Sequence, residues 1–63
     1  MPIICFWYDD PLNDDTTLIG MCQHKKRDEF ELRVQAWCSA YRRNRVNIRT
    51  TVEYLDSICA LAG

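Results

Sequence analysis

Residues 28–43 read Asp-Glu-Phe-Glu-Leu-Arg-Val-Gln-Ala-Trp-Cys-Ser-Ala-Tyr-Arg-Arg and form the most strongly patterned stretch of the chain. Apolar side chains recur in it at steps of four, three and four residues, which places them on one face of an α-helix. These side chains are Phe30, Val34, Trp37 and Tyr41. Asp28, with Glu31 three residues later, is close to a capping box, a signal for a helix start. The first expectation is therefore a helix over about 26–44.

A second helix is predicted after a short connection. Thr50 and Glu53 form a capping box directly before an apolar run. Two adjacent helical rows follow from the spacing of that run: Val52, Leu55, Cys59 and Ala62 in one, and Tyr54, Ile58 and Leu61 in the other. Because the connection over 44–49 is short, helices over about 26–44 and 50–62 should pack antiparallel as a hairpin. The predicted fold class is mainly α.

The N-terminal third has a different character. Residues 2–8, Pro-Ile-Ile-Cys-Phe-Trp-Tyr, are rich in β-branched and aromatic types and predict a short strand or an extended arm. Residues 9–15, Asp-Asp-Pro-Leu-Asn-Asp-Asp, are typical of a turn. Residues 16–23 fit either a short helix or the second strand of a hairpin. We expect one small domain of 63 residues, with an extended or hairpin arm over 1–24 and the helical hairpin over 25–63.

The apolar faces of the two predicted helices exceed what a hairpin of this size covers by itself. We expect a second copy of the chain to cover them and to complete a four-helix core in a homodimer. The predicted interface residues are Phe30, Val34, Trp37, Tyr41, Leu55 and Ile58. The alternative is that residues 1–24 fold back and complete a monomeric core.

Positive charge is confined to the centre of the chain. The formal net charge is −1, yet all eight Lys and Arg residues lie within 25–49. Four of them cluster at the predicted bend, which we call the basic bend: Arg42, Arg43, Arg45 and Arg49. Binding groups tend to lie on loops of a rigid scaffold, so the basic bend is the predicted partner-binding surface. Because arginine also contacts phosphates and bases, a nucleic-acid-binding regulator is the second hypothesis, although the predicted second helix lacks Lys and Arg.

The cysteines favour burial over chemistry. Cys5, Cys22, Cys38 and Cys59 are widely separated, whereas structural zinc sites use close ligand pairs. Only Cys22 and His24 are close, and their spacing is one residue too tight for a zinc knuckle. The favoured interpretation is that the cysteines are core thiols, with no metal and no cofactor. A zinc-stabilised module is the third functional hypothesis, after protein binding and nucleic-acid binding. The two glycines form no phosphate-binding loop and no catalytic residues are identifiable, so we expect a non-enzymatic protein.

Membrane and export signals are also missing from the sequence. No apolar stretch approaches the roughly 20 residues of a spanning helix. The apolar N-terminus lacks a basic region and a cleavage site, so it is a poor signal peptide. We expect no membrane partner and a cytoplasmic location with reduced thiols.

The 63-residue length, the motif-free predicted helical body and the reduced cysteines resemble the short accessory proteins encoded in the early regions of temperate lambdoid bacteriophages. The resemblance covers the chain in general character and transfers no functional residue. It implies a small regulatory protein in the host cytoplasm that binds a host or phage protein and biases host takeover or the lysis–lysogeny choice. The expected function is therefore a non-enzymatic homodimer that binds another protein.

Overall fold

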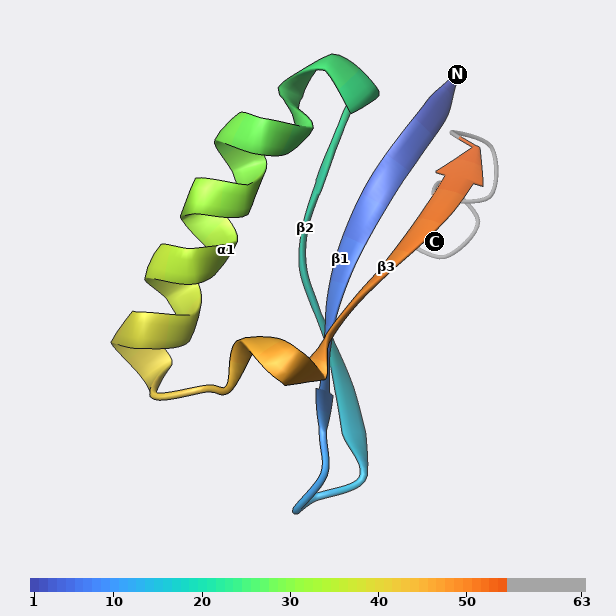
Figure 1. Ribbon diagram of the computed structural model, residues 1–63. Helices are drawn as coiled ribbons and strands as arrows, with labels where there is room; N and C mark the ends of the chain where they lie inside the picture. Colours follow the sequence, from blue (N-terminus) through green and yellow to red (C-terminus); the bar gives the residue numbers. More distant parts are fainter. Residues whose placement is uncertain (55–63) are drawn as a thin grey trace.

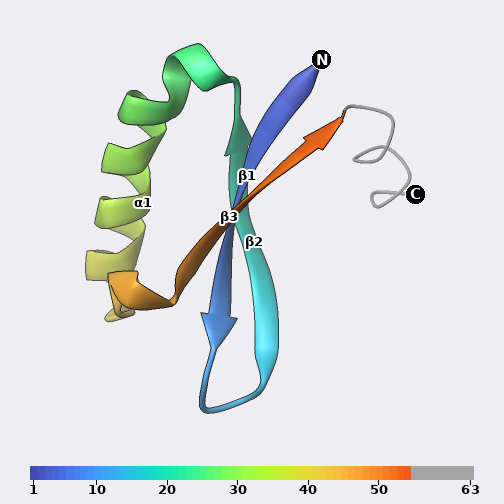
Figure 2. The same ribbon diagram turned by 45° about the vertical axis from the view of Figure 1, so that its right-hand side comes forward.

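The computed structural model describes residues 1–54 of the chain. In chain order the elements are β1 (Pro2–Asp10), β2 (Asp15–Cys22), the 3-10 turn η1 (His24–Lys26), α1 (Arg27–Tyr41), the 3-10 turn η2 (Arg45–Asn47) and β3 (Ile48–Tyr54). The strands form one antiparallel sheet in the order β2-β1-β3, and α1 lies against one face of it (Figures 1 and 2). Because β2 and β3 both run antiparallel to the central β1, they are parallel to each other. α1 connects these two parallel strands, with β1 between them, as in a split β-α-β unit.

The predicted mainly α fold, a helical hairpin over about 26–44 and 50–62, is wrong. Within residues 1–54 the chain forms one α-helix, α1, in the first of these ranges, and the start of the second range is strand β3. In Ile48–Tyr54 every second residue is β-branched or aromatic, and the strand pairs with β1 from Tyr8 back to Pro2. This alternation and the ladder outweigh the local capping signal of Thr50 and Glu53. The rest of the predicted second helix lies outside the described residues.

For the segment after the first turn, the hairpin alternative is the observed one. Strands β1 and β2 pair closely, and the loop between them spans residues 11–14. The register shifts once: Phe6 pairs with Gly20 and Trp7 with Leu18, so Ile19 is an extra residue in β2. Such a bulge turns the extra side chain out of the regular alternation. Ile19 packs against the core.

The core lies between α1 and the face of the sheet that α1 covers. Alternate residues of β1 are buried there because successive side chains of a strand point to opposite faces. The buried side chains on this face are Ile4, Phe6 and Tyr8 of β1 and Val34 and Cys38 of α1, and Cys5, which alternation places on the opposite face of β1, is buried as well. Ring centroids are 4.9 Å apart between Phe6 and Phe30 and 5.5 Å apart between Tyr8 and Trp37. The helical stripe predicted for a dimer therefore packs on the sheet of its own chain.

The end of α1 turns the chain back toward the sheet. Arg42 adopts a left-handed conformation, φ 54°, and its backbone N–H donates to the carbonyls of Cys38 and Ser39. The Asn44 side chain then accepts a 3.0 Å hydrogen bond from the Val46 N–H and begins η2. These local bonds satisfy backbone groups that a helix end leaves open. They deliver the chain to the start of β3.

Candidate functional site

The edges of the sheet are the first candidate surface. Within residues 1–54, β2 and β3 each pair with β1 on one side only. Natural proteins protect such edges with charges, proline or bulges, because free N–H and C=O groups pair readily with another chain. Strand β3 carries Arg49 and Glu53, whereas β2 has one charged residue, Asp15 at its start, and one bulge. β2 is therefore the less protected edge.

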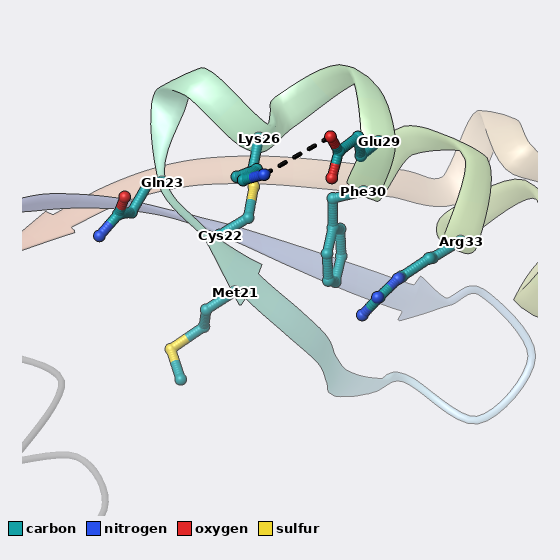
Figure 3. A pocket seen from close by; sticks show the side chains of 7 residues that line it. All are labelled: Met21, Cys22, Gln23, Lys26, Glu29, Phe30 and Arg33. Atoms are coloured by element: carbon teal, nitrogen blue, oxygen red, sulfur yellow. Dashed lines mark ion pairs between the residues drawn. The ribbon is translucent and has the colours of Figure 1, made fainter.

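A pocket of about 400 Å³ lies beside this edge, between the end of β2 and the first turns of α1 (Figure 3). Its lining residues are Met21, Cys22, Gln23, Lys26, Glu29, Phe30 and Arg33. Met21 and Cys22 are successive strand residues and point to opposite faces of the sheet, so the pocket reaches around the edge of β2. We call this feature the edge pocket.

The lining of the edge pocket combines apolar side chains, Met21 and Phe30 among them, with charged ones at the rim. The Phe30 ring extends from α1 toward β2 and lies over Gly20, where an added Cβ would come within 2.5 Å of Phe30 Cζ. Lys26 and Glu29 form an exposed ion pair of 3.6 Å, and Arg33 lies on the other side of the ring. Two of the three charged side chains are cations, so the rim favours an acidic ligand group.

The Cys22 thiol in the edge pocket is not an activated nucleophile. Burial raises the pKa of Cys22 above its ordinary value, and the nearby charge of Arg27 only partly opposes that effect. A thiol with a raised pKa remains protonated near neutral pH, and the thiolate is the reactive form. Burial likewise raises the pKa of Cys5. Among residues 1–54, no group of three or more His, Cys, Asp or Glu side chains is placed to hold a metal ion.

The structure does not assemble the basic bend into an open cluster of cations. Arg45 forms an ion pair with Glu31. Arg49 forms a bidentate ion pair with Asp9, in which Nε and Nη2 donate to the two carboxylate oxygens at 2.8 and 3.1 Å. The Arg49 guanidinium also lies 5.7 Å from the centre of the Trp7 ring. The other two arginines are at the helix end: Arg42 occupies the left-handed C-cap, and the Arg43 guanidinium lies 5.9 Å from the Tyr8 ring. Ion pairing lowers the net charge that this surface presents to a phosphate.

The four predicted dimer residues that the structure describes do not form one exposed surface either. Val34 is fully buried, Phe30 and Trp37 pack against the core, and Tyr41 is 60% exposed. Leu55 and Ile58 lie outside the described residues.

Reasoning from helical periodicity did not predict the edge pocket. Its only sequence signal is the stretch from Thr16 to Gln23, which carries no charge.

Asp9→Asn should flatten the dependence of stability on acid pH. The hydrogen bond from Arg49, and next that from Thr16, hold the pKa of Asp9 below its ordinary value. A carboxylate with a lowered folded pKa stabilises the fold above its unfolded pKa, and that contribution is lost as pH falls through the folded pKa. Urea denaturation across the acid range should therefore show a shallower slope for Asp9→Asn. Asp14→Asn, at an exposed turn position, is the control, and equal slopes for Asp9→Asn and wild type would contradict the expectation.

Comparisons with protein-family models, curated proteins and solved structures found no match to this chain. Within the described residues, no helix has the length and apolar character needed to span a membrane.

Proposed function

We propose that this chain is a small, non-enzymatic interaction protein that binds a protein partner along the β2 edge and in the edge pocket. The observation that carries the proposal is the placement of a nearly uncharged edge strand directly beside a 400 Å³ pocket whose lining combines apolar side chains with charged ones. Strand addition to such an edge supplies main-chain hydrogen bonds, and an adjacent pocket supplies side-chain specificity.

The chemistry of the edge pocket defines the kind of segment that would bind. Met21 and Phe30 offer apolar contact, while Lys26 and Arg33 favour negative charge. The matching partner is an extended segment with one aliphatic side chain between acidic residues. Charge at the rim would mainly set the association rate and the choice of partner, and the apolar contact would supply most of the affinity.

We place this activity in the cytoplasm, with a host or phage protein as the partner. One feature supports the compartment: Cys5, Cys22 and Cys38 are free thiols, and the cytosol keeps thiols reduced. The partner class follows from the resemblance to short phage accessory proteins. Direct nucleic-acid binding is the weaker proposal, because Arg45 and Arg49 already pair with acidic side chains.

Selection from a displayed library of random extended peptides tests the proposal. We expect enrichment of peptides with an aliphatic residue flanked by Asp or Glu, and weaker binding at high salt. Arg33→Glu should reduce their affinity at least about tenfold. Arg42→Glu, the same reversal at the far end of α1, should leave it unchanged. Failure to enrich such peptides, or equal loss in both variants, would refute the proposed binding surface.

A further inference from the structure

We infer that a second copy of this chain occupies the β2 edge: two β2 strands pair antiparallel about a twofold axis, and the hairpin tip of each copy enters the edge pocket of the other. This inference rests on the proposed function and specifies its partner: a second copy of the chain, in place of another host or phage protein, occupies the same surface. It joins two three-stranded sheets into one continuous sheet. Such an interface is closed, since each copy uses the same patch.

The charge along β2 and its flanks favours antiparallel self-pairing. Asp14 and Asp15 stand at the start of the strand, and Lys25, Lys26 and Arg27 follow its end, with no Lys, Arg, Asp or Glu between. An antiparallel partner places the acidic end of each strand beside the basic end of the other, whereas a parallel partner would place like charges together. Opposite charges across an interface favour one alignment and disfavour the other.

The hairpin tip carries the apolar group that the edge pocket requires. Leu12 is 91% exposed and lies among acidic turn residues. The Asp10 carboxylate accepts hydrogen bonds from the backbone N–H of Leu12 at 2.9 Å and from the Asn13 side chain at 2.9 Å. The hydrogen bond from the Asn13 side chain also holds the pKa of Asp10 below its ordinary value. The bonds to the Asp10 carboxylate fix the conformation of the turn. An ordered tip loses little entropy when it binds.

The direction of β2 agrees with this placement. The strand runs from Asp15, next to the hairpin tip, to Cys22, which lines the edge pocket. The hairpin tip lies beyond one end of β2 and the basic segment beyond the other (Figure 1). In an antiparallel pair the tip of each copy therefore lies at the end of the partner strand where the edge pocket opens. Three exposed apolar side chains lie along this path: Leu12 at 91%, Leu18 at 42% and Met21 at 43%.

Sedimentation equilibrium of the full chain at micromolar concentration is the first test. We expect a mass of twice 7.5 kDa for the wild type. Leu12→Asp should weaken the dimer at least about tenfold while leaving the circular dichroism spectrum unchanged. Leu32→Asp is the matched control, because Leu32 is a 68% exposed leucine of α1 outside the edge pocket. A monomeric wild type, or equal effects of the two variants, would overturn the inference.

Charge exchange distinguishes self-pairing from a general loss of stability. Asp15→Lys should weaken the dimer, and Asp15→Lys combined with Lys26→Asp in the same chain should restore it, because opposite charges again face one another across the interface. No restoration, with both variants folded, would overturn the inference.

A synthetic peptide separates this inference from the proposed function. The capped peptide Asp-Asp-Pro-Leu-Asn-Asp-Asp, residues 9–15, should bind the Leu12→Asp variant and compete with dimer formation by the wild type. If the wild type is monomeric yet binds library-selected acidic peptides, the second-copy inference fails and the proposed function stands. If neither those peptides nor a second copy binds, both fail.

Discussion

Phe6→Ala should lower the free energy of unfolding by about 3–5 kcal/mol, the range for truncating a buried aromatic side chain. Phe6 is fully buried at the centre of β1, and its ring lies 4.9 Å from that of Phe30. At roughly 0.05–0.15 kcal/mol per residue, a chain of this size holds about 3–9 kcal/mol in total. The variant should therefore lose a third or more of its stability, as measured by urea denaturation and far-ultraviolet circular dichroism.

Two further variants keep this expectation testable when Phe6→Ala does not fold. Phe6→Leu retains much of the apolar volume and should fold, with a smaller loss of stability. Leu32→Ala removes an exposed leucine side chain and should change stability by no more than about 0.5 kcal/mol. Near-equal losses for Phe6→Ala and Leu32→Ala would show that the core is elsewhere.

Gly20→Ala should lower the free energy of unfolding by about 1–3 kcal/mol, because it overpacks the contact between β2 and α1. An added Cβ would lie 2.5 Å from Phe30 Cζ and 3.2 Å from Phe30 Cε2, so the ring must move. In a site with free space the same change would stabilise the protein by about 0.4–1 kcal/mol, because it reduces the entropy of the unfolded chain. The sign of the effect therefore reports the close contact directly.

A double-mutant cycle with Phe30→Leu identifies the cause. If the clash with the ring is responsible, Gly20→Ala should cost at least about 0.5 kcal/mol less in the Phe30→Leu background. Chemical denaturation of the wild type, both single variants and the double variant gives this coupling energy. Additive effects, or a stabilising Gly20→Ala, would contradict the close approach of Phe30 to β2.

The proposed dimer offers a physical reason for the composition of β2. Single-domain proteins that expose an uncharged edge strand risk pairing with unrelated chains, and they usually place Lys or Pro on that edge. Here the charges stand at the two ends of β2 and have opposite signs. That pattern permits a second copy to pair with β2 in the antiparallel alignment and disfavours parallel pairing of the two strands. Pairing with a second copy would satisfy the backbone N–H and C=O groups on the open side of β2, so the strand would need no protective charge.

The outcome for the second predicted helix shows why local signals can mislead. Thr50 and Glu53 have the spacing of a capping box, and the residues after them have helical periodicity. The strand alternation of Ile48, Thr50 and Val52 is equally present in the sequence. Deciding between the two requires knowing that β1 offers a free side to pair with, and the β1 residues that pair with β3 are at least 40 positions away. Tertiary pairing overrides propensity in such cases.

The candidate surface was less predictable than the helix. Arg45 and Arg49 look like free cations in the sequence, and their partners Glu31 and Asp9 are 14 and 40 residues away. The edge pocket joins residues from β2, η1 and α1 through the packing of Phe30 over Gly20. No spacing rule links a glycine to an aromatic ring ten residues later across a turn.

By itself the sequence determined the position and apolar face of α1, the turn after β1 and the opposite charges at the two ends of β2. These features follow from helical period, turn chemistry and charge order, all of which act between near neighbours along the chain. Only the tertiary structure decided that β3 is a strand, that the arginines are paired and that a pocket opens beside β2. Those outcomes depend on contacts between distant segments, whose free energy exceeds the small local preferences that a sequence displays.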